Sequence, residues 1–280
     1  MKTLNTFFSL ALSGALAAAV PGAQAQQSFY ERFESHNSIM AGLQPSWVAP
    51  LVESDPRLGQ SARFAFSNEY APGARTVSYG NGRGVTLVAP TRLEFDFNPP
   101  SYFQNHSATL KDGAGDAAMQ VKYRIASGDA RHGNFIVTAM LYRSFATGTY
   151  ANGAPTGVFV PKLAAGVLFR RFDVQTTLGG AMPTGKIAAQ GRAIEWNVAA
   201  QAHATAHVWF EVENNATFNY GGPYDAKTQN FITPAAFYMV RRKDWAPTHP
   251  FFIVDGGMQI ATTTFHLYNH NLISEVRILF

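Results

Sequence analysis

From residue 61 to the end of the chain, apolar and polar side chains alternate with a period of two. Residues 92–98 show this most clearly, because charged or amide side chains fill the even positions and Leu or Phe fills the odd ones. Residues 119–125, 194–200 and 207–213 repeat the alternation. Successive side chains of a strand point to opposite faces, so the pattern predicts strands with one polar and one apolar face.

The length of these stretches separates two kinds of β protein. A soluble sandwich with one face in water also alternates, but strands in globular proteins average about five or six residues. Here the alternating stretches run for about 9 to 12 residues, the length that crosses a bilayer in a tilted strand. Tyrosines near the strand ends suit the aromatic girdles of a membrane barrel; they are Tyr70, Tyr79, Tyr102, Tyr142, Tyr220, Tyr238 and Tyr268.

Connection lengths also fit a membrane barrel, in which short periplasmic turns alternate with longer external loops. With the C-terminus in the periplasm, we expect strands at 61–70, 83–88, 91–98, 116–126, 133–145, 163–170, 173–182, 191–201, 205–217, 230–241, 249–262 and 269–280. The external connections are then 71–82, 99–115, 146–161, 183–190, 218–229 and 263–268.

We therefore predict an all-β fold, a transmembrane antiparallel up-and-down β-barrel over residues 61–280 with about 12 strands (roughly 10 to 14). Two features leave the exact number of strands open. The second strand is short, and Pro234 lies inside the tenth. Because proline cannot donate to the ladder, that position requires a bulge or a shifted boundary.

The N-terminus has the features of a secretory signal peptide. Lys2 precedes an apolar run over residues 7–20, which Pro21 and Gly22 break, and Ala23-Gln24-Ala25 matches a small-x-small cleavage site. The run of about 14 residues is short of the roughly 20 that a membrane anchor needs. We predict a signal peptide at 1–25, cleavage near Ala25, and a mature chain in the bacterial outer membrane.

Residues 26–60 differ from the rest of the chain. Residues 28–40 mix aromatic and charged side chains without alternation, and residues 44–60 contain Pro45, Pro50 and Pro56. Prolines at this spacing favour an extended or turn-rich chain. We interpret 26–60 as an N-terminal periplasmic segment or plug, and a disordered leader fits equally well.

Composition narrows the class of protein further. The chain is 46% hydrophobic and 13% aromatic but only 14% charged, against roughly 25% charged residues in average soluble domains. A lipid-facing exterior accounts for the shortfall. The net charge is +4 without a long Lys/Arg run, so we expect no nucleic-acid partner. The absence of cysteine excludes disulfides, thiolate metal sites and a lipoprotein cysteine.

Strand parity predicts which polar side chains line the lumen. Because their charges are mixed, we expect ion pairs that narrow or close the pore. Glu211 and Glu213 lie about 7 Å apart by strand rise, a spacing at which carboxylates can serve acid/base chemistry, but a position in the lumen is the favoured interpretation. The lumen-lining candidates are Arg92, Glu94, Asp96, Gln120, Lys122, Arg124, Asp173, Glu195, Asn197, Glu211, Glu213, Glu275 and Arg277.

No catalytic or metal-binding constellation stands out. His203 and His207 are four residues apart, as are His266 and His270, and on a strand that spacing is about 13 Å, too far for one metal. Ser107 adjoins His106, but adjacent strand residues point to opposite faces, which argues against a Ser–His pair. We predict no catalytic residues, no metal and no cofactor.

The chain ends in an alternating apolar strand that closes with an aromatic residue. Counting back by twos gives Phe280, Ile278, Val276 and Leu272. This pattern resembles the signal by which the barrel-assembly machinery recognises outer-membrane proteins, so that machinery and outer-membrane lipid are the expected partners. A chain that simply ends in a buried strand is the alternative.

Short motifs carry a family resemblance over most of residues 44–280. They are Gly115-Asp116, the strand with Gln120, Lys122 and Arg124, residues 179–185 with Met182-Pro183-Thr184-Gly185, residues 210–214, and residues 230–234. In these segments the chain resembles the outer-membrane proteins grouped as the "MetA-pathway of phenol degradation" family. Gln44-Pro45-Ser46-Trp47 and Asp55-Pro56-Arg57-Leu58 are similar to uncharacterised relatives of that group. The resemblance implies a barrel that admits hydrophobic compounds, and it supplies no catalytic residues.

The function expected from these observations is a channel or facilitator for small molecules, hydrophobic ones included. A barrel of 12 strands is wider than one of about eight, whose interior side chains just fill it. The alternatives are a structural or surface-interaction barrel without transport, a lipid-acting barrel enzyme, and a soluble periplasmic β protein.

Overall fold

The computed structural model describes residues 29–80, 84–89, 91–240 and 251–280. The predicted signal peptide lies outside these residues. The chain divides into two units, Met1–Phe33 and Glu34–Phe280, and all the strands belong to the second. Among the described residues, no helix is long and apolar enough to cross a membrane, a finding that does not bear on crossing by strands.

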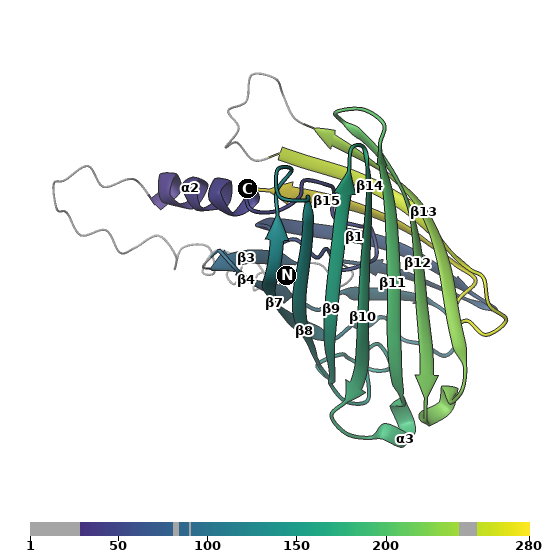
Figure 1. The fold of residues 1–280 in the computed structure, drawn as a ribbon. Coiled ribbons are helices and arrows are strands. Elements are labelled where there is room, and N and C mark those ends of the chain that lie inside the picture. The colour runs from purple at the N-terminus through teal and green to yellow at the C-terminus, as the bar shows by residue number, and fades with distance from the viewer. Residues whose placement is uncertain (1–28, 81–83, 90, 241–250) are drawn as a thin grey trace, which may run out of the picture. The chain divides into compact units, whose positions relative to one another are not determined.

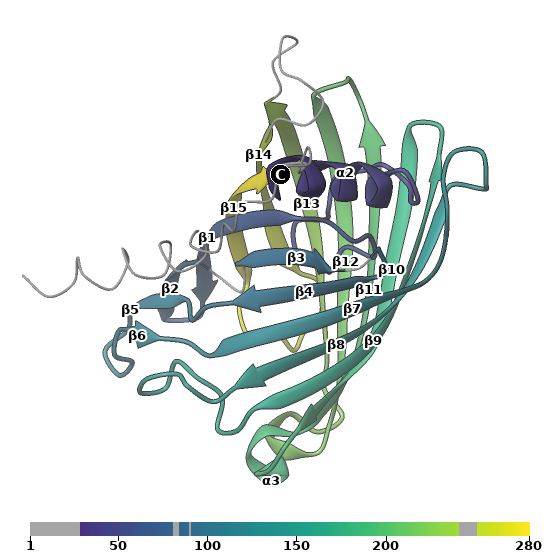
Figure 2. The same ribbon diagram turned by 90° about the vertical axis from the view of Figure 1, so that its left-hand side faces the viewer.

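Antiparallel strands form one continuous sheet that closes on itself (Figures 1 and 2). Closure is made by the first and last strands, which pair from Ser61↔Leu279 to Tyr70↔His270. The strands are β1 (Ser61–Ala71), β2 (Ala74–Tyr79), β3 (Val85–Ala89), β4 (Leu93–Asn98), β5 (Tyr102–His106), β6 (Gly113–Ala114), β7 (Ala117–Gly128), β8 (Phe135–Phe145), β9 (Val158–Phe169), β10 (Phe172–Pro183), β11 (Arg192–His203), β12 (Val208–Tyr220), β13 (Thr228–Val240), β14 (Phe251–Ala261) and β15 (His270–Leu279).

In three cases two elements lie end to end and act as one strand of the wall: β2 with β3, β4 with β5, and β6 with β7. The 15 elements therefore make up a barrel wall of 12 strands. This confirms the predicted all-β, closed antiparallel barrel. We call the end that holds the C-terminus the near end and the opposite end the far end. Three short helical elements complete the described chain: α2 (Phe29–Ala41), α3 (Ile187–Gln190) and η1 (Gly222–Tyr224).

The predicted connections 71–82 and 99–115 were wrong. The first is a tight β1–β2 hairpin in which Ala71 pairs with Ala74, and the second contains β5 and β6. The predicted second strand, 83–88, is therefore part of a longer strand that is interrupted. Gly80, Gly84 and the Pro99–Pro100 pair break the alternation at these places, which is why the sequence pattern resembled loops.

Two prolines lie inside strands, and Pro234 does so with neither the bulge nor the shifted boundary that we expected. Pro234 of β13 pairs with Val212 of β12, while its pairing with β14 is interrupted between Ile232 and Ala235 with no change of register. Pro161 lies within β9, although we placed it at the end of a loop, and it pairs with Leu141. Both prolines are exposed. A missing N–H is tolerated because the ladder is open on one side of each strand.

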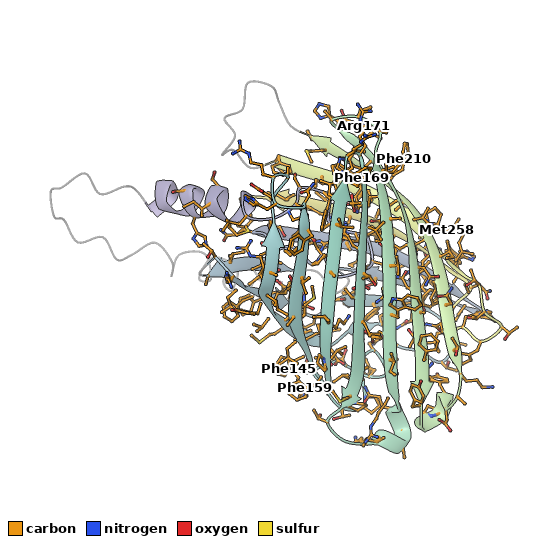
Figure 3. All side chains as sticks on the ribbon, in the orientation of Figure 1. Phe145, Phe159, Phe169, Arg171, Phe210 and Met258 are labelled. Carbon is orange, nitrogen blue, oxygen red and sulfur yellow. The ribbon has the colours of Figure 1, made fainter. Side chains whose placement is uncertain are left out.

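The two faces of the sheet differ as the alternation predicts. Large apolar side chains point outward, among them Phe64, which is 58% exposed, and Leu178, which is 55% exposed. Polar side chains point inward and are buried, such as Glu213 and Thr138 at 0% exposure. Figure 3 shows Phe145 and Phe159 together near the far end and Phe169 near the opposite end. The arrangement is inverted relative to a soluble domain and suits a sheet surrounded by lipid.

Candidate functional site

The interior of the barrel contains part of its own chain. Residues 44–60, which we call the inner segment, follow α2 without regular secondary structure. Inward-facing side chains of the strands hydrogen-bond to its backbone at several points along its length. The barrel therefore encloses an extended peptide held mainly by side-chain-to-backbone contacts.

Two acidic residues of β12 accept the amides at the centre of this segment. Glu211 accepts from the Leu51 N–H at 3.1 Å. Glu213 accepts from the Val52 N–H at 2.7 Å and from the Glu53 N–H at 2.9 Å. Three successive amides thus converge on two buried carboxylates.

On the β15 side, Arg277 binds the segment through carbonyl groups. Its guanidinium donates to the Ala49 carbonyl and, at 3.0 Å, to the Pro50 carbonyl. The same side chain is 2% exposed and lies 2.8 Å from Asp255 and 2.7 Å from Glu275. The cation is therefore neutralised by the wall while its donors reach the segment.

Lys122 of β7 makes a third attachment. Its ammonium lies 2.6 Å from Glu94 and 4.0 Å from Asp96, and it donates to the Asp55 carbonyl at 3.2 Å. Glu94 in turn accepts from the Gly59 N–H at 2.5 Å. Both members of this ion pair thus contact the inner segment.

Neutral side chains add further contacts with the segment. Thr138 donates to the Pro56 carbonyl at 2.5 Å, and Gln201 donates to the Val48 carbonyl at 2.8 Å. Within the segment, Gln44 donates to the Leu58 carbonyl at 2.6 Å and accepts from the Leu58 N–H at 3.0 Å. This reciprocal pair closes the segment into a loop.

Apolar packing accompanies these bonds at the near end. Trp47 packs closely against Gly166, where an added Cβ would lie 2.7 Å from the indole Cη2. Beside the segment is a cavity of about 420 Å³, with Trp47, Met239, Phe251 and Leu279 among its lining residues. The apolar cluster consists of Met40, Trp47, Val48, Leu51, Leu58, Val88, Ile136, Trp209, Ala235, Phe237, Ile253 and Ile273.

Two acids of the inner segment have opposite electrostatic environments. Burial raises the pKa of Glu53, and the nearby Lys162 offsets this only in part. Burial would also raise the pKa of Asp55, but Arg57, which lies 2.7 Å away, and Lys122 together hold that pKa below its ordinary value. The segment therefore contains one carboxyl group that resists ionisation and one that favours it.

The lumen-lining candidates fall into three groups. Arg92 lies in the turn before β4 and is exposed. Glu195, which pairs with Lys162 at 3.2 Å, and Asn197 are half-buried on β11. The others are buried: Glu94, Asp96, Gln120, Lys122, Arg124, Asp173, Glu211, Glu213, Glu275 and Arg277.

Sequence reasoning missed several residues of the interior. Arg63 pairs with Glu275 at 2.5 Å, and Asp255 pairs with Arg277. Strand parity would have found both, because each occupies an inward position on a strand that we predicted. Ile136, Phe237 and Ile253 also point inward, but the alternation does not predict this. It assigns polar side chains to the lumen and apolar side chains to the lipid-facing side.

The histidines do not converge on one site. His203 lies 3.3 Å from Asp173, whereas His207 contacts the Met239 carbonyl. His266 bonds within its own loop, to the carbonyl of Thr263. Across the described ranges, no group of three His, Cys, Asp or Glu side chains is placed to hold a metal ion.

Comparisons with known proteins identify the fold. No protein-family model matches the chain, and no curated protein matches it. The NanC porin is similar with a TM-score of 0.51 and 9% identity, covering 79% of this chain and 98% of that chain. An outer membrane channel from Pseudomonas putida F1 has a TM-score of 0.50 and 12% identity, covering 84% of this chain and 100% of that chain.

At these identities the likeness establishes the fold alone. Together with the apolar exterior and the closed wall of 12 strands, it defines a membrane-type β-barrel with the fold of outer-membrane porins and channels. Inside this barrel lies the inner segment, which the strand side chains hold through its backbone.

Proposed function

We propose that the protein is an outer-membrane channel for small molecules whose lumen is closed by residues 44–60 acting as a plug. The observation that carries this proposal is how the inner segment is attached. Apart from one backbone bond at its last residue, from the Phe280 N–H to the Gln60 carbonyl, its described contacts with the wall are side-chain hydrogen bonds and apolar packing, and no described strand pairing includes it. Such a segment can shift while every strand pair of the barrel stays intact.

Small apolar or weakly polar molecules are the substrate class that the interior favours. The buried Lys122 and Arg277 and the half-buried Arg63 are each paired with carboxylates, which leaves little free charge to attract ions. The cavity at the near end combines those ion pairs with the apolar side chains of Trp47 and Met239. Membership in the MetA-pathway group, with its hydrophobic compounds, stays a prediction that agrees with this lining.

Signal-peptide cleavage near Ala25 belongs to the same proposal. It would deliver the mature chain to the periplasm, from which the barrel enters the outer membrane with its near end facing the periplasm. Mass spectrometry of the mature protein purified from the outer membrane tests this. An N-terminus at Gln26 is expected, and a retained leader contradicts the processing.

The channel proposal is tested by conductance in planar bilayers and by liposome swelling. The key variant combines Glu211→Gln and Glu213→Gln, because it weakens the acceptors of three plug amides without altering side-chain volume. We expect low or intermittent conductance in the natural protein and an open-time fraction raised about tenfold or more in the double variant, since hydrogen bonds to charged groups contribute about 1.5–3 kcal/mol each.

Glu69→Gln is the matched control, because Glu69 lies on β1 and makes no described hydrogen bond with the inner segment. It should conduct like the natural protein. Deleting residues 46–57 removes most of the plug and should raise the conductance more than the double variant does. If neither the double variant nor the deletion conducts, the channel proposal is wrong, and a structural barrel without transport becomes the better interpretation.

A further inference from the structure

A polar row interrupts the apolar exterior at the far end of the barrel. Arg75 of β2 lies opposite His106 of β5 on one side and Tyr70 of β1 on the other, and Tyr70 lies opposite His270 of β15. Directly opposed residues of neighbouring strands share a face. The four side chains therefore form one row across four strands, about 14 Å wide at the usual strand spacing.

This row faces outward. Phe64 on β1, Tyr102 on β5 and Leu272 on β15 have the same strand parity as Tyr70, His106 and His270, and they are 58%, 50% and 48% exposed. The row lies near the strand ends remote from Phe280, where an outer-membrane barrel meets the headgroup region of the surrounding leaflet. A cationic side chain at this height is in reach of lipid headgroups.

Contacts with Asn68 and with Tyr70 of the row fix the orientation of Arg75. Its Nε donates to the Asn68 side-chain oxygen at 2.7 Å, and its guanidinium carbon lies 5.5 Å from the centre of the Tyr70 ring. The Asn68 amide donates to the Tyr70 hydroxyl at 2.8 Å. On the other side, the Tyr70 ring stacks on His270 with centroids 4.6 Å apart. The side chain is held in place before any ligand arrives.

The remaining donors of Arg75 are available. Within the described part of the chain, its two Nη groups form no hydrogen bond and no ion pair, and the residue is exposed. The neighbouring His106 is also exposed and adds an imidazole donor. A guanidinium fixed through Nε presents its Nη donors as a fork, which matches the oxygen spacing of phosphate.

We propose that Arg75, His106, Tyr70 and His270 form a binding site for the phosphate of a lipid in the leaflet around the far end. Charge complementarity selects a phosphorylated lipid over a neutral one, and the surrounding exposed Phe64, Tyr102 and Leu272 contact its acyl chains. This inference concerns the exterior and does not depend on the channel proposal.

Native mass spectrometry of the purified full-length barrel in neutral detergent tests the site. The probes are dioleoyl phosphatidic acid, dioleoylglycerol with the same acyl chains, and inorganic phosphate. We expect phosphatidic acid to bind, dioleoylglycerol to bind at least tenfold more weakly, and inorganic phosphate not to compete at equal concentration. Competition by inorganic phosphate at that concentration would show a simple anion site and would overturn the lipid proposal.

Arg75→Gln removes the charge but keeps an amide beside Asn68, and we expect it to weaken phosphatidic acid binding about tenfold. Arg131→Gln, at an exposed position in the turn after β7, is the matched control and should bind like the natural protein. The heat-dependent gel shift of folded barrels verifies that both variants are folded. Should Arg75→Gln fold poorly, His106→Gln replaces it and is expected to weaken binding by a smaller factor. Equal affinity in all folded variants would contradict the site.

Discussion

Buried carboxylates are satisfied by the inner segment's backbone as well as by cations of the wall. Glu211 and Glu213 are 2% and 0% exposed, and an ionised carboxylate in such a position needs several donors. The amides of residues 51–53 supply three of them. The wall and the segment therefore stabilise each other, because neither set of polar groups is fully paired without the other.

The ion pair between Lys122 and Glu94 provides a test of this mutual dependence. Lys122→Met should remove the partner of a fully buried carboxylate and the two hydrogen bonds that the ammonium donates to the Asp55 and Arg57 carbonyls, lowering the free energy of unfolding by about 3–5 kcal/mol. Urea titration in lipid vesicles measures it. Lys162→Met is the control, because its pair with Glu195 is more exposed and should contribute less. Equal losses would contradict a special role for Lys122.

The two acids of the inner segment should respond to pH in opposite directions. Because the folded-state pKa of Glu53 is raised, its charge costs stability at neutral pH, and this cost fades as pH falls from that raised value towards the ordinary 4.5. Glu53→Gln should therefore slow amide exchange of the inner segment at about pH 7 and have little effect at about pH 4.

Asp55→Asn is the matched variant of opposite sign. The folded-state pKa of Asp55 is lowered, so its charge stabilises the fold above its ordinary value, and that stability is lost only as pH falls through the lowered one. We expect faster exchange in Asp55→Asn at about pH 7, with most of the difference remaining at about pH 4. Parallel behaviour of the two variants would show that their environments are not opposed.

For individual residues, the sequence predicted the direction of the side chain but not its partners. Period-two parity predicts Glu94 and Lys122 on one face, because direction along a strand depends only on position, and in the structure the two side chains lie 2.6 Å apart across β4 and β7. It could not predict that Glu213 would bind the backbone of residues some 160 positions earlier. Backbone amides are the same at every residue, so a contact with them leaves no pattern in the sequence.

Strand elements were predicted where the alternation is unbroken and missed where glycine or proline interrupts it. β10, β11 and β12 closely match the expected ranges. β2 and β5 were assigned to loops, because Gly80 and the Pro99–Pro100 pair separate them from their continuations β3 and β4. A sheet tolerates such breaks when neighbouring strands on both sides hold the register, and neighbours are not visible in a single segment.

The last strand provides an element-scale test of the assembly signal, which stays a prediction. β15 closes the barrel against β1, and the Phe280 N–H donates to the Gln60 carbonyl at 3.2 Å. We expect Phe280→Ser to reduce the amount of folded barrel in cells several-fold, because recognition by the assembly machinery is lost. The heat-dependent gel shift of outer-membrane extracts measures this amount.

Refolding from urea into detergent separates recognition from stability. Phe280→Ser should refold in vitro about as completely as the natural protein, since few contacts of the wall are removed. A refolding defect as large as the cellular defect would show that Phe280 stabilises the barrel and is not a recognition signal.

For the whole molecule, the decisive property is that the closed sheet is apolar outside and polar inside. The sequence predicted this inversion because closure follows from alternation, strand length and connection length together. It left open whether residues 26–60 enter the barrel. Plug, periplasmic segment and disordered leader are all compatible with the prolines of residues 44–60, because a contact such as that of Trp47 with Gly166 leaves no pattern in the sequence.

An arginine scan of the exterior tests whether lipid surrounds the barrel. Leu178 lies near the middle of β10, is 55% exposed, and pairs with Leu163 and Trp196 on its two sides. Leu178→Arg should destabilise the barrel folded in phosphatidylcholine vesicles by about 2–4 kcal/mol, the cost of a cation at the bilayer midplane. Phe169→Arg, at the near-end terminus of β9, should cost about 0–1 kcal/mol, because its charge reaches the interface. In short-chain detergent the difference should shrink, since water reaches both positions. Equal costs in vesicles, or a larger cost at Phe169, would mean that the apolar exterior does not face a bilayer core.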